Sequence, residues 1–212
     1  MPCLPYDLQA VDNHPFAERR PVLELLDAIH TRRTIKDFKP DPVPNAVLER
    51  ALNAGLWAQN HRLTEPWRFI VLGPATQNAL AEAGAAAQLR SLASDTDDAT
   101  RAKVQAAARQ KILSKPLIVA VTYLLSGDAL QRREDYAATC CAIQNIQLAA
   151  WAEGLGMQWN TGKQTQQPQT YTLLGIDPAA EEIAGFLYFG YPAVVPPPVT
   201  RKHLSEVMRR LP

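Results

Sequence analysis

The chain has 212 residues, and its 22 Lys and Arg against 21 Asp and Glu give a formal net charge of +1. A length of about 200 residues suits one domain with its own core, and the balanced charge argues against a nucleic-acid binder with a domain-wide basic field. A hydrophobic content of 47% also argues against disorder. Proline is unusually frequent, with 17 residues against 10 glycines.

Targeting and redox signals favour a cytoplasmic protein. Residues 1–16 lack the basic start and apolar stretch of a signal peptide. The longest near-apolar run, residues 117–125, is shorter than the ~20 residues that a membrane span needs. Cys140 and Cys141 are adjacent, which suits neither a disulfide framework nor a zinc ribbon. We therefore expect reduced thiols and no membrane partner.

The first half of the chain is predicted to be mostly helical. Residues 1–21 are rich in proline and indicate an extended arm. Apolar residues at helical spacing predict helices over residues 22–30 and 47–56, and residues 68–72 predict a short strand. The Ala-rich residues 75–115 predict two peripheral helices, with a break where an aspartate or serine can cap the second. We place that break at residues 94–98.

The second half contains the strongest strand and the strongest helix. Residues 117–123 are a β-branched apolar run, which is typical of a strand covered on both faces. Residues 134–153 predict a long helix, and its apolar residues lie nearly all round, as in a buried central helix. Further along, the pattern predicts an extended piece, a short helix and a last strand over residues 157–159, 169–174 and 183–191.

The signatures of several common enzymes are missing. None of the four histidines has another at i+4, and GxSxG and GxGxxG do not occur. Gly162-Lys163 is similar to the end of a P-loop, but Met157 stands where its first glycine belongs and Gln164 replaces its Ser or Thr. We therefore expect no metal site and no catalytic acid–base dyad.

Three polar clusters remain as candidate binding segments. Residues 32–38 carry two arginines, a threonine and a lysine, which are donors that suit a phosphate. Residues 60–69 contain a histidine and a tryptophan. Residues 159–162 end in Gly162, beside which a ligand can approach the backbone closely. Each cluster alone is also explained as ordinary structure: a solvated basic turn, a core indole and a strand end.

Taken together and in this order, the clusters resemble the nitroreductase family of flavoproteins. The family's motif Arg-Arg-Ser/Thr-x-Arg/Lys-x-Phe is followed by a Pro-Val-Pro helix start, a Gln-Pro-Trp-x-Phe segment, a central helix, a last strand and a basic tail. The loop at residues 60–62 is most similar to that of the short members. The matching segments are residues 32–38, 42–44, 65–71, 142–150, 154–156, 159–162, 186–192 and 201–202.

The resemblance implies an α+β protein with a three-layer fold, in which helices flank a central, mostly antiparallel sheet. It also implies an interlocked homodimer with FMN at the subunit interface, and NADH or NADPH as co-substrate. On this basis residues 22–191 form the FMN-binding domain. The arm at residues 1–21 and the tail at residues 192–212 would wrap the partner, since a stiff, proline-rich chain loses less entropy on docking.

The same resemblance assigns the phosphate end of the cofactor site. Arg32 and Thr34 would hold the phosphate and the ribityl chain, and Arg33 would lie beside them. Arg201, or in its place Lys202, would complete the phosphate site. These cations would offset the phosphate dianion, whose burial without partners is prohibitive, while the charge of the whole chain stays near zero.

The ring end is assigned in the same way. Lys36 would lie under the pyrimidine edge, where a cation stabilises the reduced flavin. His61 of the partner subunit would close over the cofactor. No side chain is assigned as catalytic, because flavin N5 carries the hydride and the protein orients and tunes it. The residues expected to line the isoalloxazine are Trp159, Asn160, Thr161 and Gly162.

Our first hypothesis is therefore a ping-pong reaction, in which NAD(P)H reduces FMN and a small electron-poor acceptor, such as a nitroaromatic, quinone or enone, then reoxidises it. One alternative is another flavin reaction on the same fold, either reductive dehalogenation or fragmentation of FMN; residues 75–115 are the candidate for the lid it would need. The other alternative is a non-catalytic flavin-binding dimer, suggested by Leu63 and Glu65, which depart from the family's loop.

Overall fold

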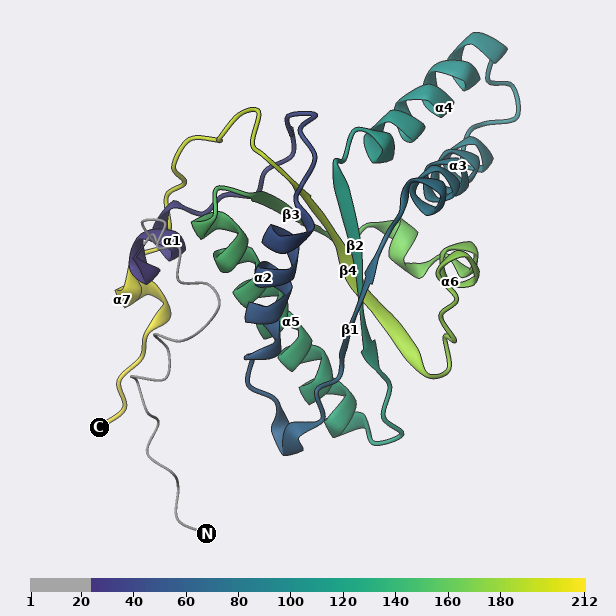
Figure 1. The fold of residues 1–212 in the computed structure, drawn as a ribbon. Coiled ribbons are helices and arrows are strands. Elements are labelled where there is room, and N and C mark those ends of the chain that lie inside the picture. Colours follow the sequence, from purple (N-terminus) through teal and green to yellow (C-terminus); the bar gives the residue numbers. More distant parts are fainter. Residues whose placement is uncertain (1–23) are drawn as a thin grey trace.

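The computed structural model describes residues 24–212, so the arm expected at residues 1–21 lies outside the described residues. Its centre is a four-stranded sheet in the order β1-β2-β4-β3 (Figure 1). All neighbouring strands pair antiparallel. The strands are β1 (Trp67–Val71), β2 (Leu117–Leu124), β3 (Gly156–Asn160) and β4 (Glu181–Gly190).

Helices cover both faces of the sheet, which confirms the expected three-layer α+β fold (Figure 1). One layer holds α2 (Asn45–Leu56) and α5 (Ala129–Ala152). The other holds α6 (Pro168–Leu174) and a hairpin made by α3 (Pro74–Arg90) and α4 (Asp98–Leu113). The short elements are α1 (Leu25–Thr31), η2 (His61–Leu63), η3 (Lys163–Gln166) and α7 (Leu204–Val207).

Strand β2 supplies both halves of the core. Alternate side chains of a strand point to opposite faces, so Val119 and Val121 pack toward the layer of α2 and α5, while Ile118 and Ala120 pack toward the layer of α3, α4 and α6. All four are fully buried. The prediction of a strand covered on both faces is confirmed.

Helix α5 differs from its prediction in two respects. It begins five residues earlier than expected, because the Asp128 side chain caps it by accepting a hydrogen bond from the backbone N–H of Gln131. It is also not buried all round: one side packs on the sheet, while Tyr136 on another side is 41% exposed. In the described protomer α5 therefore presents an uncovered side.

The break inside residues 75–115 lies where the sequence predicts it. Helix α3 ends at Arg90 and α4 begins at Asp98, with Asp97 as its cap. The hairpin is less peripheral than expected, because Leu80 and Ala81 of α3 are fully buried in the core. Gln77 Nε2 also donates to the carbonyl oxygens of Ile112 and Lys115, at 3.0 and 2.8 Å.

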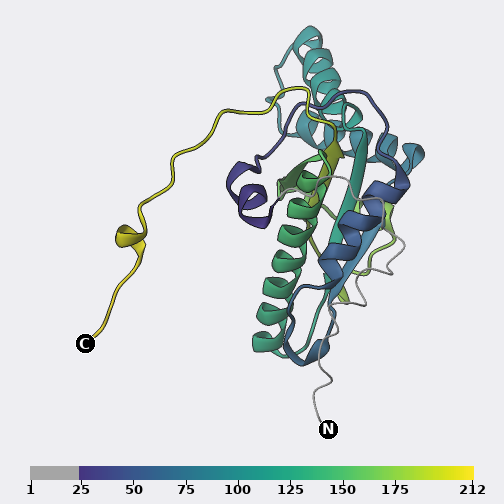
Figure 2. The same ribbon diagram turned by 60° about the vertical axis from the view of Figure 1, so that its left-hand side comes forward.

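The chain after β4 leaves the body of the protein. Figure 2 shows this tail running away from the helices, with α7 near its end.

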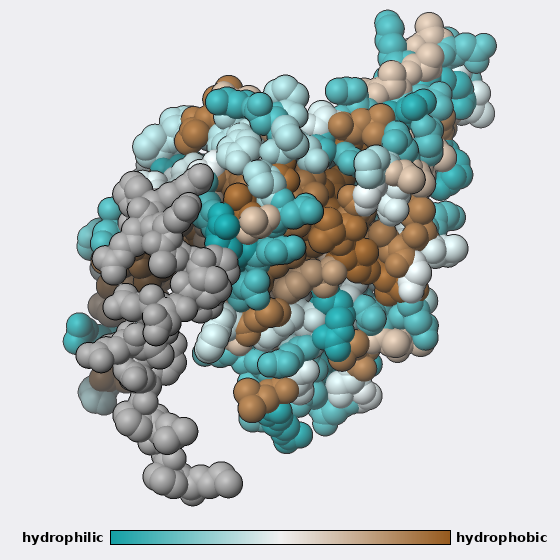
Figure 3. All heavy atoms as spheres, in the orientation of Figure 1, coloured by the Kyte–Doolittle hydropathy of each residue, from teal (hydrophilic) through white to brown (hydrophobic). Residues whose placement is uncertain are grey.

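Apolar side chains also gather over the middle of the face drawn in Figure 3. Large exposed apolar residues at the two ends include Leu25, Leu26, Val194, Val195, Val199, Leu204, Val207 and Leu211.

Within residues 24–212, no helix combines the length and the apolar character needed to cross a membrane.

Candidate functional site

The structure brings arginines from the two ends of the described chain together. Arg32 directly follows α1, and both burial and the positive charges of Arg201 and Arg33 lower its pKa. Arg33 is held in place by donating from Nη1 to the carbonyl oxygen of His30 at 2.9 Å and from Nε to that of Pro197 at 3.3 Å. Within residues 24–212 no carboxylate forms a salt bridge with these arginines. The cluster is therefore suited to an anion.

Thr34 and Lys36 lie next to this cluster on the exposed side of an extended segment. Ile35, between them, is fully buried and its N–H donates to the carbonyl oxygen of Met157 in β3 at 3.2 Å. Its neighbours therefore point the other way, and both are exposed. Gly156 permits this contact, because a Cβ there would lie 2.6 Å from Cγ1 of Ile35.

Lys115 is a residue of this region that the sequence reasoning missed. Its Nζ donates to the carbonyl oxygen of Lys36 at 2.7 Å and lies 5.3 Å from the ring centroid of Phe38. Burial lowers its pKa, partly offset by the charge of Asp37. Lys115 follows α4, and no local pattern links it to residues 32–38. It fixes the backbone from which the Lys36 side chain extends.

The segment from Trp159 to Gly162 is held by side-chain hydrogen bonds. The Trp159 indole donates to the carbonyl oxygen of Ala184 at 3.1 Å. Asn160 donates from Nδ2 to the hydroxyl of Tyr188 at 2.6 Å, and its Oδ1 accepts from the N–H of Gly162 at 2.8 Å. Burial raises the pKa of that tyrosine hydroxyl. The Gly162 N–H is therefore engaged by Asn160, whereas Thr161 is exposed.

His61 lies apart from the other predicted residues in the protomer. It belongs to η2, which packs near the start of α5, whereas β3 follows the end of α5 (Figure 1). The loop around it has a defined shape: Thr64 Oγ1 donates to the buried Asp135 at 2.7 Å, and Asn60 Oδ1 accepts from the N–H of Glu65 at 2.9 Å. The strain in this loop, where Arg62, Leu63 and Glu65 all have positive φ, is typical of a functional segment.

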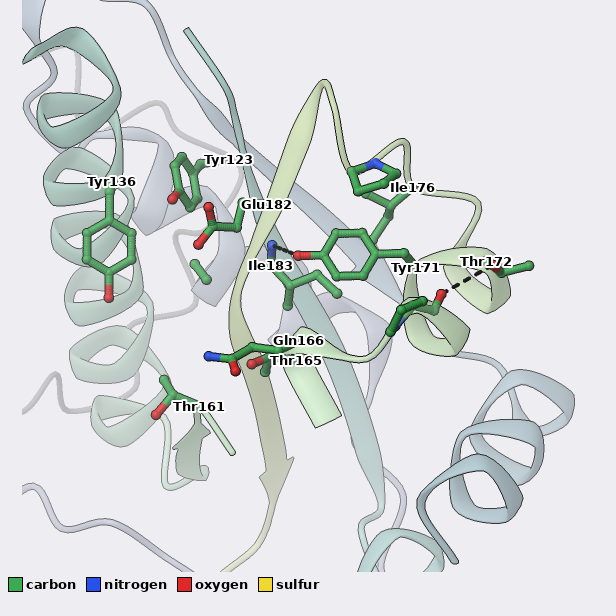
Figure 4. Close-up of a pocket in the computed structure, with 13 residues that line it drawn as sticks. Tyr123, Tyr136, Thr161, Thr165, Gln166, Tyr171, Thr172, Ile176, Glu182 and Ile183 are labelled. Carbon is green, nitrogen blue, oxygen red and sulfur yellow. Dashed lines mark hydrogen bonds between the residues drawn. The ribbon is translucent and has the colours of Figure 1, made fainter. Parts of the chain in front are cut away.

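Two cavities adjoin the turn after β3. The larger, of about 840 Å³, lies between α5, the start of β4 and α6, and Thr161 is part of its wall (Figure 4). The smaller, of about 360 Å³, lies between the α3–α4 hairpin and η3, and its wall includes Asn160, Gly162 and Lys111. Among residues 24–212 no group of three His, Cys, Asp or Glu side chains is placed to hold a metal ion.

Comparisons with known proteins agree on one family. The model of the nitroreductase family matches residues 29–191. YfhC of Bacillus subtilis, which bears the name of an NAD(P)H nitroreductase, is 36% identical over 173 residues, covering 81% of this chain and 86% of that protein. YdjA of Escherichia coli, with the same kind of name, is 29% identical over 174 residues, covering 80% and 89%.

Solved structures show the same fold. A nitroreductase-like family protein from Bacillus cereus superposes with a TM-score of 0.77 at 28% identity, covering 91% of this chain and 98% of that one. A nitroreductase-fold protein from Desulfovibrio desulfuricans, solved in complex with FMN, has a TM-score of 0.66 at 24% identity, covering 90% and 98%.

Proposed function

The chain belongs to the nitroreductase family, and on that premise we propose that it is an FMN-dependent oxidoreductase that oxidises NADH or NADPH and reduces a small electron-poor acceptor. The acceptor classes are nitroaromatics, quinones and enones. The names of YfhC and YdjA support the nicotinamide co-substrate, and the FMN complex of the Desulfovibrio protein supports the cofactor. Bound FMN would supply hydride transfer through its N5.

The arginine cluster is the observation that carries this proposal. Arg32 is partly removed from water and lies close to two further cations, which disfavours its charge. A phosphate dianion among Arg32, Arg33 and Arg201 would reverse the repulsion and accept several charge-assisted hydrogen bonds. Thr34, exposed beside them, offers a hydroxyl. The residues present therefore fit the phosphate end of FMN.

The remaining assignments follow the exposed side of the same region. The Lys36 side chain is exposed one residue beyond the buried Ile35, and a cation there favours uptake of negative charge at the pyrimidine edge. The exposed Thr161 lies at the turn between the two cavities and would face the ring system with Trp159, Asn160 and Gly162. Because Asn160 engages the Gly162 N–H, we assign that glycine to close approach of the ring rather than to donation.

We further propose that the functional unit is a homodimer in the cytoplasm. The uncovered side of α5, the exposed apolar residues of α1 and the tail all need a partner surface. The distance of η2 from β3 in the protomer is consistent with His61 of the partner subunit completing the site. Cys140 and Cys141 are free, as in a reducing compartment.

The α3–α4 hairpin does not favour the alternative flavin reactions. Its expected role there was a lid, but Gln164 Nε2 donates to the carbonyl oxygen of Leu80 at 2.8 Å and ties the hairpin to η3. The Gln77 bonds hold α3 to the end of α4 within the hairpin, and the burial of Leu80 and Ala81 fixes α3 to the core.

The test is anaerobic spectroscopy of the purified protein after reconstitution with FMN. We expect a stoichiometric flavin band that NADH or NADPH bleaches and that menadione or a nitroaromatic restores. Failure to bind FMN would contradict the proposal. Bound flavin that neither nicotinamide bleaches would instead support the non-catalytic dimer.

A further inference from the structure

The larger cavity occupies a part of the sheet that β3 leaves open. Strand β3 pairs with β4 only from Phe186 to Gly190, so the edge of β4 before residue 186 faces the cavity. Side chains partly satisfy that edge: the Tyr171 hydroxyl accepts from the N–H of Ile183 at 3.2 Å, and Trp159 donates to the carbonyl oxygen of Ala184. The cavity is thus a built feature of the sheet edge.

Three tyrosines form its walls (Figure 4). Tyr123 of β2 and Tyr136 of α5 lie with ring centroids 5.4 Å apart and planes at 57°. Tyr171 of α6 lies on the opposite side, beyond the start of β4. Aromatic faces of this kind bind planar rings by stacking and organic cations by cation–π attraction.

Among residues 24–212, Glu182 is the single charged residue in the wall. It is directly opposite Tyr123 in the β2–β4 register, so the two side chains share one face of the sheet. Burial and this carboxylate together raise the pKa of the Tyr123 hydroxyl. No lysine or arginine within residues 24–212 forms a salt bridge with Glu182. Glu182 is exposed and accepts a hydrogen bond from the Tyr123 hydroxyl, which leaves its negative charge in place beside a ligand in the cavity.

The cavity also adjoins the segment proposed to line the isoalloxazine. Thr161 forms part of its wall and directly precedes Gly162, and the indole of Trp159 bonds to Ala184, another wall residue. A ligand held between the tyrosines would extend toward this segment. The charge of this ligand would interact with the carboxylate of Glu182.

We propose that this cavity binds the acceptor, and that Glu182 makes it select planar aromatic acceptors that are neutral or cationic over anionic ones. The inference rests on the proposed function, which supplies the reducing flavin, and adds the substrate class. Glu182 is then a specificity-determining residue, and the tyrosines supply affinity for planar rings and add to the preference for a cation.

The first test is binding, measured by calorimetry on the full-length, FMN-loaded protein with three probes that flavins do not reduce. These are benzyltrimethylammonium, benzyl alcohol and phenylacetate. We expect the cation to bind at least about tenfold more tightly than the anion. Glu182→Gln is expected to reduce the affinity for the cation about fivefold. The matched control is Glu181→Gln, because Glu181 lies outside the cavity wall and accepts a hydrogen bond from Thr122 Oγ1. Removing the charge of Glu181 is expected to leave the preference for the cation over the anion intact.

Tyr136→Leu tests the aromatic contribution. Because Tyr136 is 41% exposed on the side of α5 proposed to face the partner subunit, sedimentation velocity first checks that the variant remains dimeric. It is expected to weaken binding of all three probes, and to weaken binding of the cation most, because the cation also loses a cation–π contact. In turnover, Glu182→Gln is expected to raise KM for a cationic nitrobenzyl acceptor and to lower KM for para-nitrobenzoate.

Equal binding of cation and anion by the wild-type protein, or an unchanged preference in Glu182→Gln, would overturn the inference. If the enzyme reduces menadione but shows no charge preference, the inference fails while the proposed function stands. If the protein takes up no FMN, the proposed function fails, and the same titrations on the flavin-free protein still test whether the cavity prefers cations.

Discussion

The indole Nε1 of Trp159 donates to the carbonyl oxygen of Ala184 at 3.1 Å, and this contact exists because the next residue of β4 has no side chain. A Cβ on Gly185 would lie 2.2 Å from that Nε1 and 3.0 Å from the carbonyl oxygen of Asn160. One glycine in a buried strand therefore sets the position of the indole and of the turn that follows β3.

Gly185→Ala is accordingly expected to lower the free energy of unfolding by about 2–3 kcal/mol, because neither the indole nor the backbone beside it can yield without repacking. Urea unfolding followed by far-UV circular dichroism measures this. Gly127→Ala is the control, since a Cβ there meets nothing within 4 Å, and its effect should stay within about 0.5 kcal/mol. Equal stability of the two variants would show that the contact between Trp159 and Ala184 does not require a glycine at position 185.

Leu63 is expected to destabilise the folded protein relative to an asparagine at the same position. Its side chain is 81% exposed and its φ is 53°, a left-handed conformation that a leucine adopts at a cost and an asparagine tolerates. Leu63→Asn should raise the free energy of unfolding by about 0.5–1 kcal/mol, whereas Leu63→Ala should have little effect. Thermal unfolding of both variants decides this, and a destabilised Leu63→Asn would contradict it.

Asp97 is expected to give α4 an acid-sensitive cap. Its carboxylate accepts from the N–H and the hydroxyl of Thr100, and these bonds lower its pKa in the folded state. The folded state therefore favours the ionised form. Its stabilising contribution is present above the unfolded pKa of 3.8 and is lost as the pH falls through the lower folded value.

Asp97→Asn keeps a capping acceptor but removes the titration, so its unfolding free energy should fall less steeply than that of the wild-type protein as the solution is acidified below about pH 4. Urea midpoints over this range measure the difference. Asp95→Asn, in the same loop but not the capping residue, should follow the wild-type curve. Parallel curves for Asp97→Asn and the wild type would refute the assignment.

The tail is expected to serve both association and cofactor binding. Ending the chain after Pro198 removes Arg201 and the apolar residues of α7, so it should weaken FMN binding and shift the protein toward monomer. Arg201→Ala should weaken FMN binding alone. Analytical ultracentrifugation with FMN titration separates the two effects, and a truncated protein that remains fully dimeric would rule out the wrapping role.

Local signals were sufficient to predict most of the fold. The β-branched run predicted β2, and the Ser- and Asp-rich residues 94–98 predicted the break before α4, because strand propensity and helix capping act over a few residues. The start of α5 was missed because its first turns are polar, although Asp128 was an available capping signal. Its exposed side was missed because apolar composition does not show which side of a helix faces the core.

The site was predictable only where the family motifs cover it. Arg32 and Arg201 were paired through the resemblance, and the structure places their charges close together. Lys115 and Gly185 belong to the same region through contacts between segments that are distant in sequence. Periodicity carries no information about such pairs, so neither could be found from local pattern.

The most direct measurement is the dissociation constant of the flavin-free protein for FMN and for riboflavin, which lacks the phosphate, in the wild type and in Arg32→Ala. Loss of one charge-assisted phosphate contact should weaken FMN binding by about 2 kcal/mol, or roughly thirtyfold, and leave riboflavin binding unchanged. Arg90→Ala, at the exposed end of α3, should change neither. If Arg32→Ala binds FMN as tightly as the wild type, or loses FMN and riboflavin equally, the arginine cluster is not the phosphate site.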